Sequence, residues 1–259
     1  MSVRILDLDN IATWQDTYNE FIRNDSFWEV IEDAISQEED DKIQNILLEL
    51  DVRIECVKYP EVVSLRNRCN DHFTQNYTHA AAYHACRPTN IESYMSSGIL
   101  PANTEKLIEK AKDFFDDTDA VNEAVKEIGT AYLEHGAGKI GFFQSRSGSV
   151  ESGYSHYLCY GSELFQSIAN RLGEWAMEKL ANRGTPTVFR RALPISWLDE
   201  FTTFPMAHSY AKAPLEQLLV KLRWPEHQES TIRGAFLLTR SVPKEYVLEP
   251  IDMTSFLTK

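Results

Sequence analysis

Residues able to do chemistry gather first in the stretch 83–100. Tyr83, His84 and Arg87 follow a short run of small residues, and Pro88 disfavours helical geometry at Arg87. A helix is predicted directly afterwards, so an imidazole and a guanidinium lie beside its positive end, where an anion can be held. Two structural interpretations stay open: His84 as a core histidine bonded to a backbone carbonyl, and Arg87 as an ion-pair partner of Glu92.

A second polar group occupies residues 154–163. Tyr157, Tyr160, Ser162 and Glu163 lie close together in sequence at the start of another predicted helix. This density of hydroxyl and carboxylate side chains favours a functional site. The structural interpretation is that the tyrosines are core rings, Ser162 caps the helix and Glu163 complements the helix dipole.

The elements that must position the first stretch are a strand and a capped helix. Residues 80–83 are small or aromatic and suit a buried strand. Thr89 and Glu92 form a T-x-x-E capping box that predicts the helix start. Gly98 supplies the left-handed residue that ends the helix.

Helical patterns dominate the beginning of the chain and strand patterns the end. Trp14, Tyr18, Phe21 and Ile22 share one helical face, and further helices are predicted near 26–35, 43–50 and 62–73. Later helices are predicted at 107–115, 121–132, 164–172 and from Pro214 to 222, strands at 139–144, 185–194, 231–239 and 245–249, and a mobile loop at 145–155. This order predicts an α+β protein with an acidic helical region, 1–75, and an α+β domain, 76–259.

Composition and charge narrow the function classes. Of the net charge of −13, residues 1–75 contribute 17 Asp and Glu against 7 Lys and Arg, while the remainder is nearly balanced. This acidity argues against a non-specific nucleic-acid binder. Neither an apolar run of membrane length nor a signal segment is visible, so we expect a cytoplasmic protein without a membrane partner. The four cysteines are widely scattered, so we expect free thiols and no metal site.

Several of these stretches resemble the ADP-ribosyltransferase fold, in its polymerase-like and toxin branch. The order Tyr83-His84-Ala85-Cys86-Arg87, helix, Gly98-Ile99-Leu100 is similar to the first motif of that fold. Residues 138–143 resemble its second motif strand, 160–172 the helix that follows, and 233–247 the closing pair of strands. The resemblance covers about residues 76–259 and implies a split antiparallel sheet with helices, preceded by the helical N-terminal part.

The resemblance also implies roles for individual residues. His84 would hold the ribose and nicotinamide of NAD, Arg87 the pyrophosphate or ribose, and a phenylalanine would replace the family's stacking tyrosine. The family's carboxylate belongs at the start of the closing strand, where this chain has glycine and alanine, so Glu163 or Glu229 must supply it; Glu163 is preferred because polar candidates surround it. The implied catalytic residues are His84, Tyr160, Glu163 and Glu229, and the implied NAD-binding residues are Tyr83, Arg87, Phe142, Phe143 and Ser162.

The activity that follows from the resemblance is mono-ADP-ribosyl transfer. NAD is the substrate, its nicotinamide–ribose bond is cleaved, and ADP-ribose passes to a nucleic acid or protein acceptor, in the manner of a bacterial toxin or phage-defence effector. The alternative is a catalytically degenerate nucleotide-binding or protein-interaction module of the same fold. Acidic N-terminal helices that recruit an antitoxin or another basic partner are a third hypothesis, and a metal-dependent nuclease is a fourth.

Overall fold

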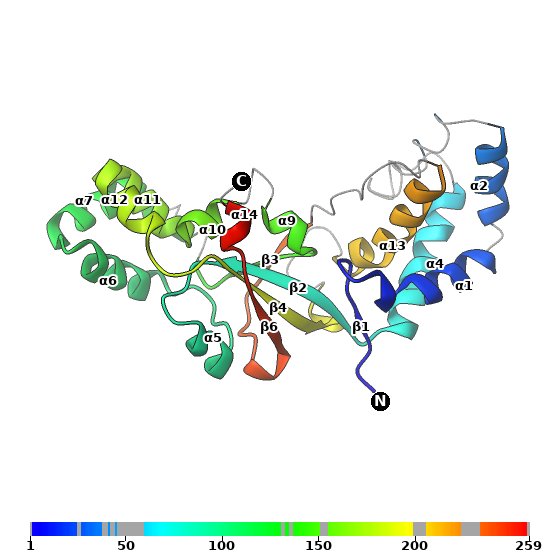
Figure 1. The fold of residues 1–259 in the computed structure, drawn as a ribbon, viewed down its shortest axis with the longest axis horizontal. Helices are drawn as coiled ribbons and strands as arrows, with labels where there is room; N and C mark the ends of the chain where they lie inside the picture. Colours follow the sequence, from blue (N-terminus) through cyan, green and yellow to red (C-terminus); the bar gives the residue numbers. More distant parts are fainter. Residues whose placement is uncertain are drawn as a thin grey trace. The chain divides into compact units, whose positions relative to one another are not determined.

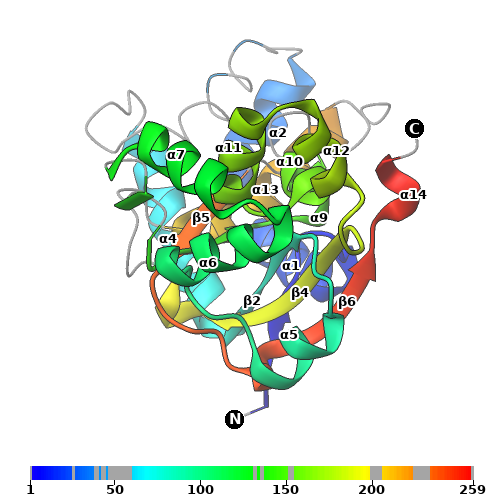
Figure 2. The ribbon, with the colours of Figure 1, turned by 90° about the vertical axis from the view of Figure 1, so that its left-hand side faces the viewer.

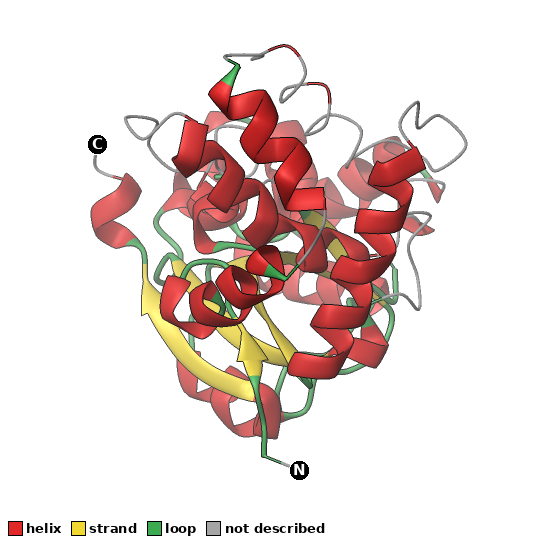
Figure 3. Ribbon diagram, turned by 90° about the vertical axis from the view of Figure 1, so that its right-hand side faces the viewer, coloured by secondary structure: helices red, strands yellow, loops and turns green. Residues whose placement is uncertain are grey.

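The chain combines α-helices with a mainly antiparallel sheet (Figure 1, Figure 3), in agreement with the α+β class. Two compact units divide it: unit 1 comprises Met1–Ala81 and Pro194–Gly234, and unit 2 comprises Ala82–Leu193 and Ala235–Lys259. The structure is a computed structural model. It describes residues 2–24, 27–37, 41, 45, 60–130, 133–134, 137–150, 155–198, 206–223 and 234–257.

Unit 1 is mainly helical. Tyr18 and Ile22 are buried on α1, and Trp14, the residue that precedes it, is buried as well, which confirms most of the predicted helical face. The Tyr18 hydroxyl donates to the Ala211 carbonyl at 2.6 Å, which joins α1 to α13, and α4 packs along α13. The elements are β1 (Ile5–Leu6), η1 (Ile11–Thr13), α1 (Gln15–Arg23), α2 (Phe27–Ser36), α4 (Pro60–Asn76), η3 (Ile195–Trp197) and α13 (Met206–Arg223).

The prediction that Pro214 opens a helix is wrong. Pro214 lies inside α13, which begins at Met206. A proline within a helix loses one backbone hydrogen bond and costs about 3 kcal/mol. Burial of Tyr210, Leu215 and Leu219 on α13 offsets that cost, because each fully buried large apolar side chain contributes roughly 1.5–3 kcal/mol.

The sheet of unit 2 has the strand order β5-β3-β2-β4-β6. Antiparallel pairing places Tyr83 opposite Phe143 and Phe142 opposite Phe236. At the other side β4 pairs antiparallel with β6. The first residues of β2, His79 and Ala80, belong to unit 1 and pair in parallel with β1 within that unit. The strands are β2 (His79–Cys86), β3 (Ile140–Phe143), β4 (Thr187–Pro194), β5 (Ala235–Leu238) and β6 (Val247–Asp252).

Strand alternation divides the predicted site residues between the two faces of this sheet. Residues directly opposite each other in an antiparallel pair share a face, and successive residues alternate. Tyr83 and Phe143 therefore share one face, and His84 and Phe142 lie on the other. Cys86, two residues after His84, lies on the His84 face.

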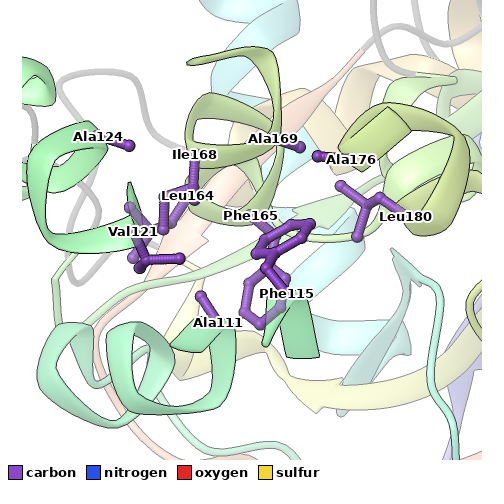
Figure 4. Packing of buried hydrophobic residues seen from close by; sticks show 10 residues of the cluster. All are labelled: Ala111, Phe115, Val121, Ala124, Leu164, Phe165, Ile168, Ala169, Ala176 and Leu180. Carbon is purple, nitrogen blue, oxygen red and sulfur yellow. The ribbon is translucent and has the colours of Figure 1, made fainter. Parts of the chain in front are cut away.

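Four helices of unit 2 share a hydrophobic cluster (Figure 4). Phe115 of α6 and Phe165 of α11 meet in it with ring centroids 6.1 Å apart, and α11 packs on α6, α7 and α12 (Figure 2). The buried members are Ala111, Phe115, Val121, Ala124, Leu164, Phe165, Ile168, Ala169, Ala176 and Leu180. The helices of the unit are α5 (Ile91–Ser97), α6 (Thr104–Phe115), α7 (Thr118–Ile128), α9 (Arg146–Val150), α10 (His156–Tyr160), α11 (Glu163–Leu172), α12 (Glu174–Ala181), η4 (Lys244–Tyr246) and α14 (Thr254–Leu257).

Two local predictions in unit 2 are wrong. The cap of α5 is Asn90, whose side chain accepts from the Ser93 N–H at 3.2 Å, in place of Thr89. Asparagine is as good a cap as threonine or better, and starting here moves the first turn by one residue. Residues 146–150 form α9 where a loop was predicted, and Ser149 is buried there.

Some predictions fall outside the described residues. These include most of the predicted helix 43–50, Glu229, and residues 151–154 of the second polar group. Within the described ranges, no helix is both long and apolar enough to cross a membrane. No group of three or more His, Cys, Asp or Glu side chains in those ranges could hold a metal ion.

Candidate functional site

The candidate site is the His84 cluster, on one face of the sheet of unit 2. It consists of His84, Cys86, Tyr94, Phe142, Phe189 and Arg191, from strands β2, β3 and β4 and helix α5. His84 is bonded through Nδ1 to the Gly141 carbonyl at 2.9 Å. Because a carbonyl only accepts, Nδ1 carries the proton and Nε2 is left as an acceptor.

The imidazole of His84 is neutral at physiological pH. Its side chain keeps partial exposure, with the Tyr94 ring at 6.4 Å and the Phe142 ring at 5.7 Å between centroids. Burial of the ring lowers the pKa of His84 to about 4; the Gly141 bond opposes this shift and the charge of Arg191 adds to it. His84 can therefore accept a hydrogen bond at Nε2 across the whole neutral range.

Tyr94 connects the α5 helix to both β2 and β4. Its ring stacks on Phe189 at 4.8 Å with 13° between the planes, and its hydroxyl donates to the Cys86 sulfur. Burial raises the pKa of Cys86 to about 12 and raises the pKa of Tyr94 above its ordinary 10. Both groups are therefore uncharged at neutral pH.

Arg191 is a buried cation for which no described residue supplies a counter-ion. Its side chain is fully buried and lies over the Phe189 ring at 5.1 Å, and none of its three guanidinium nitrogens has a hydrogen-bond partner among the residues that the structure describes. Burial lowers its pKa to about 10, so it remains protonated at neutral pH. Buried charges are normally paired, which makes this arginine the electrostatic centre of the cluster.

A second arginine approaches the cluster from the loop before β4. The Arg183 guanidinium lies 4.6 Å from the Phe165 ring centroid, and its charge acts on the pKa of Tyr94. Arg87 holds this loop, since its Nε donates to the Arg183 carbonyl at 2.6 Å. Gly184 permits the close approach: its φ is 61°, and a Cβ there would meet the Pro88 carbonyl oxygen at 2.2 Å.

The structure brings His84 and Phe142 together but separates them from Glu163. Glu163 accepts from the Tyr157 hydroxyl and lies 3.8 Å from Nε2 of His156. Tyr157 in turn contacts Phe143, on the sheet face opposite His84. Among the described residues, no interaction of His84 involves a carboxylate.

The remaining predicted residues have structural contacts. Tyr83 is buried on the Phe143 face, and Tyr160 packs against the hydrophobic cluster of Figure 4. The Ser162 side chain caps α11 by accepting from the Phe165 N–H, as the structural interpretation predicted. Arg87 donates to two backbone carbonyls, those of Arg183 and Leu158, and makes no ion pair with Glu92.

Sequence reasoning did not assign four members of the site, which are Cys86, Tyr94, Phe189 and Arg191, nor Arg183 beside it. Tyr94 lies in the helix predicted after Pro88, and Arg191 lies in the strand predicted at 185–194. A signal for Arg191 did exist, because in that strand it occupies the same phase as Phe189 and Leu193, which are buried. A charged residue at a core position of a strand indicates a functional or paired group.

Comparisons with known proteins add no family assignment. The sequence matches no protein-family model and no curated protein, and the structure matches no solved structure.

Proposed function

We propose that unit 2 binds a nucleotide of the NAD type on the sheet face that carries His84. The observation that supports this most directly is the state of the imidazole, which is neutral and presents Nε2 as an acceptor. A ribose hydroxyl is a donor that such a nitrogen binds. The rings of Tyr94 and Phe142 beside it supply aromatic surface for a base or a nicotinamide.

The sequence supports the same ligand class. Residues 83–100 and the strands that follow resemble the ADP-ribosyltransferase fold, and His84 is the residue to which that resemblance assigns ribose and nicotinamide. The mixture of helices and antiparallel strands in unit 2 is compatible with such a fold. In this proposal the module binds the dinucleotide without cleaving it.

Transfer of ADP-ribose to a nucleic acid or protein is a second candidate function. The reaction needs a carboxylate that stabilises an oxocarbenium-like transition state. Glu163 favours this candidate, because it is exposed and bonded to Tyr157 within the same unit. It ranks second because these contacts lie on the face opposite His84.

The test is a calorimetric titration of the full chain with NAD. We expect saturable binding that weakens about two- to tenfold in His84→Gln, because one hydrogen bond contributes about 0.5–1.5 kcal/mol. His79→Gln is the matched control: His79 lies on the same strand and is also partly buried, so its variant should bind like the wild type. Absence of saturable binding, or equal affinities of wild type and His84→Gln, would refute the proposed function.

Chromatography of free nicotinamide separates the two candidates. Binding without release supports the non-cleaving module. Release that persists with an acceptor present, and that Glu163→Gln abolishes, supports the transferase instead.

A further inference from the structure

Arg183 and Arg191 are two cations whose charges both act on Tyr94. The charges of both lower the pKa of Tyr94, which burial raises. Arg191 lies over the Phe189 ring, on which Tyr94 stacks. The loop that carries Arg183 is bonded to the Pro88 carbonyl, just before α5. Neither arginine has an acidic partner among the residues that the structure describes. Nε of Arg183 and all three guanidinium nitrogens of Arg191 are buried without a hydrogen-bond partner there.

No acidic group among the described residues compensates the charge of Arg191. Phe189 offers Arg191 a cation–π contact, but an aromatic face does not satisfy the five N–H donors of a guanidinium. Cys86 and Tyr94 are the acidic groups whose charge would stabilise Arg191, and both stay protonated at neutral pH. The described residues therefore supply no anionic partner for Arg191, and an external anion could take that place.

We propose that Arg191 and Arg183 form a phosphate-binding site beside Tyr94, which takes a phosphate or diphosphate group of a ligand. Two guanidinium groups match the roughly double negative charge of a phosphate monoester or a diphosphate, and the planar fork of arginine bonds phosphate oxygens in pairs. A carboxylate carries only one charge and would leave one arginine uncompensated. The phosphate site is inferred from the contacts of Arg191 and Arg183 alone. Only its assignment to an NAD-type ligand rests on the proposed function.

A ligand reaches Arg191 past groups that can move. Arg191 has no exposed surface, whereas His84, Cys86, Tyr94 and Arg183 around it are all partly exposed. Tyr94 belongs to α5, a helix of seven residues of which none is buried. Displacing its side chain breaks the stack on Phe189 and the bond to Cys86 but exposes no buried residue of α5, so we assign the opening of the site to Tyr94.

The same geometry gives Arg87 a positioning role. Its bond to the Arg183 carbonyl, together with the bond from the Thr185 N–H to the Pro88 carbonyl at 3.1 Å, fixes the loop that carries Arg183. Arg87 thus acts on the phosphate through another residue. Its guanidinium is already used by two backbone carbonyls.

The experiment titrates the full chain with inorganic pyrophosphate, inorganic phosphate and ADP at constant ionic strength, by calorimetry and thermal shift. We expect binding of pyrophosphate or phosphate by the wild type, and affinity at least tenfold weaker in Arg191→Met and in Arg183→Met. Arg190→Met is the matched control, since Arg190 is the neighbouring arginine and pairs with Glu249 at 3.2 Å; its affinity should be unchanged. Tighter binding of pyrophosphate than of phosphate identifies a diphosphate group, and equal affinity identifies a single phosphate; both support the site.

Stability distinguishes a binding arginine from a structural one. Arg191→Met removes a buried charge that no described residue pairs, so its unfolding temperature should equal or exceed that of the wild type while binding is lost. The proposal is overturned if no probe binds the wild type at millimolar concentration, or if Arg191→Met binds with wild-type affinity. If Arg191→Met folds poorly, the affinities of Arg183→Met and Arg191→Lys test the proposal instead. Undiminished binding in both variants overturns the phosphate site.

NAD as a fourth probe keeps this proposal separate from the proposed function. Pyrophosphate binding without NAD binding supports the phosphate site and refutes the proposed function. NAD binding that is equal in wild type and Arg191→Met supports the proposed function and overturns the assignment of the phosphate site to that ligand.

Discussion

Replacing Gly184 with alanine tests how the loop that carries Arg183 is held. A Cβ at Gly184 would lie 2.2 Å from the carbonyl oxygen and 2.7 Å from the carbonyl carbon of Pro88. Both atoms belong to the backbone and cannot rotate away. An ordinary contact begins near 3.4 Å, so the two segments must separate by about 1 Å.

The expected cost has two parts. Alanine in the left-handed region costs about 1–2 kcal/mol, and crowding that shifts the backbone adds about 1–3 kcal/mol. Gly184→Ala should therefore lower the free energy of unfolding by about 2–5 kcal/mol. Gly138→Ala is the matched control, because Gly138 has a similar φ of 70° but nothing within 4 Å of its Cβ position, so only the first part applies.

Urea denaturation followed by tryptophan fluorescence measures both variants, with the slope of the transition compared to the wild type. The two variants should differ by at least about 1 kcal/mol. A difference below about 0.5 kcal/mol, the usual scatter for substitutions without a special feature, would contradict the close approach of the two segments. If the approach is real, the displaced loop should also weaken pyrophosphate binding in Gly184→Ala and leave it unchanged in Gly138→Ala.

Three further substitutions test other parts of unit 2. Phe165→Ala should lower the free energy of unfolding by about 3–5 kcal/mol in the same assay, because it empties the centre of the helical cluster; a loss below about 1 kcal/mol would mean that the ring is not packed there. His84 has a folded pKa of about 4 against an ordinary 6.5, so the unfolded chain binds more protons between these values and stability is lost as the pH falls through that window. The stability difference between wild type and His84→Gln should accordingly change between about pH 6.5 and 4 and stay constant above; a difference independent of pH contradicts the assigned state. Ser162→Ala removes a helix cap and should cost about 1 kcal/mol with NAD affinity unchanged, whereas weakened NAD binding would make Ser162 a ligand contact.

Local sequence patterns predicted the elements of this protein better than they predicted its site. The face shared by Tyr18 and Ile22 is buried on α1, because the helical period of 3.6 follows from burial of one side. The strand predicted at 185–194 contains β4, which is buried on both faces. Gly98 ends α5 with φ 76°, as its position before Ile99 indicated. The prediction of a helix start at Pro214 was wrong because burial of the surrounding α13 residues outweighs the unfavourable effect of a proline inside a helix.

The site depends on register, which local patterns do not contain. Tyr94 meets Phe189 across nearly one hundred residues of sequence, and this meeting surrounds Arg191 with neutral groups. Likewise, the sequence alone makes Glu163 and His84 equally suitable site residues. The pairing of Tyr83 with Phe143, however, places the contacts of Glu163 and those of His84 on opposite faces of the sheet. The residue types indicated which side chains could form a site, and the strand pairing determined which of them lie together on one face of the sheet.

The assembly of unit 1 from two distant segments has a consequence for how the chain is made and cut. Helix α4 ends at Asn76 and its packing partner α13 begins at Met206. During synthesis, about 130 residues must therefore be added after α4 before the residues of α13 are present. Until then its apolar side, which includes the buried Leu65 and Phe73, has to be shielded by something other than α13. A fragment that starts at residue 76 leaves α13 in the converse position, with Tyr210 and Leu219 deprived of their cover, and such a fragment should aggregate even though unit 2 is intact.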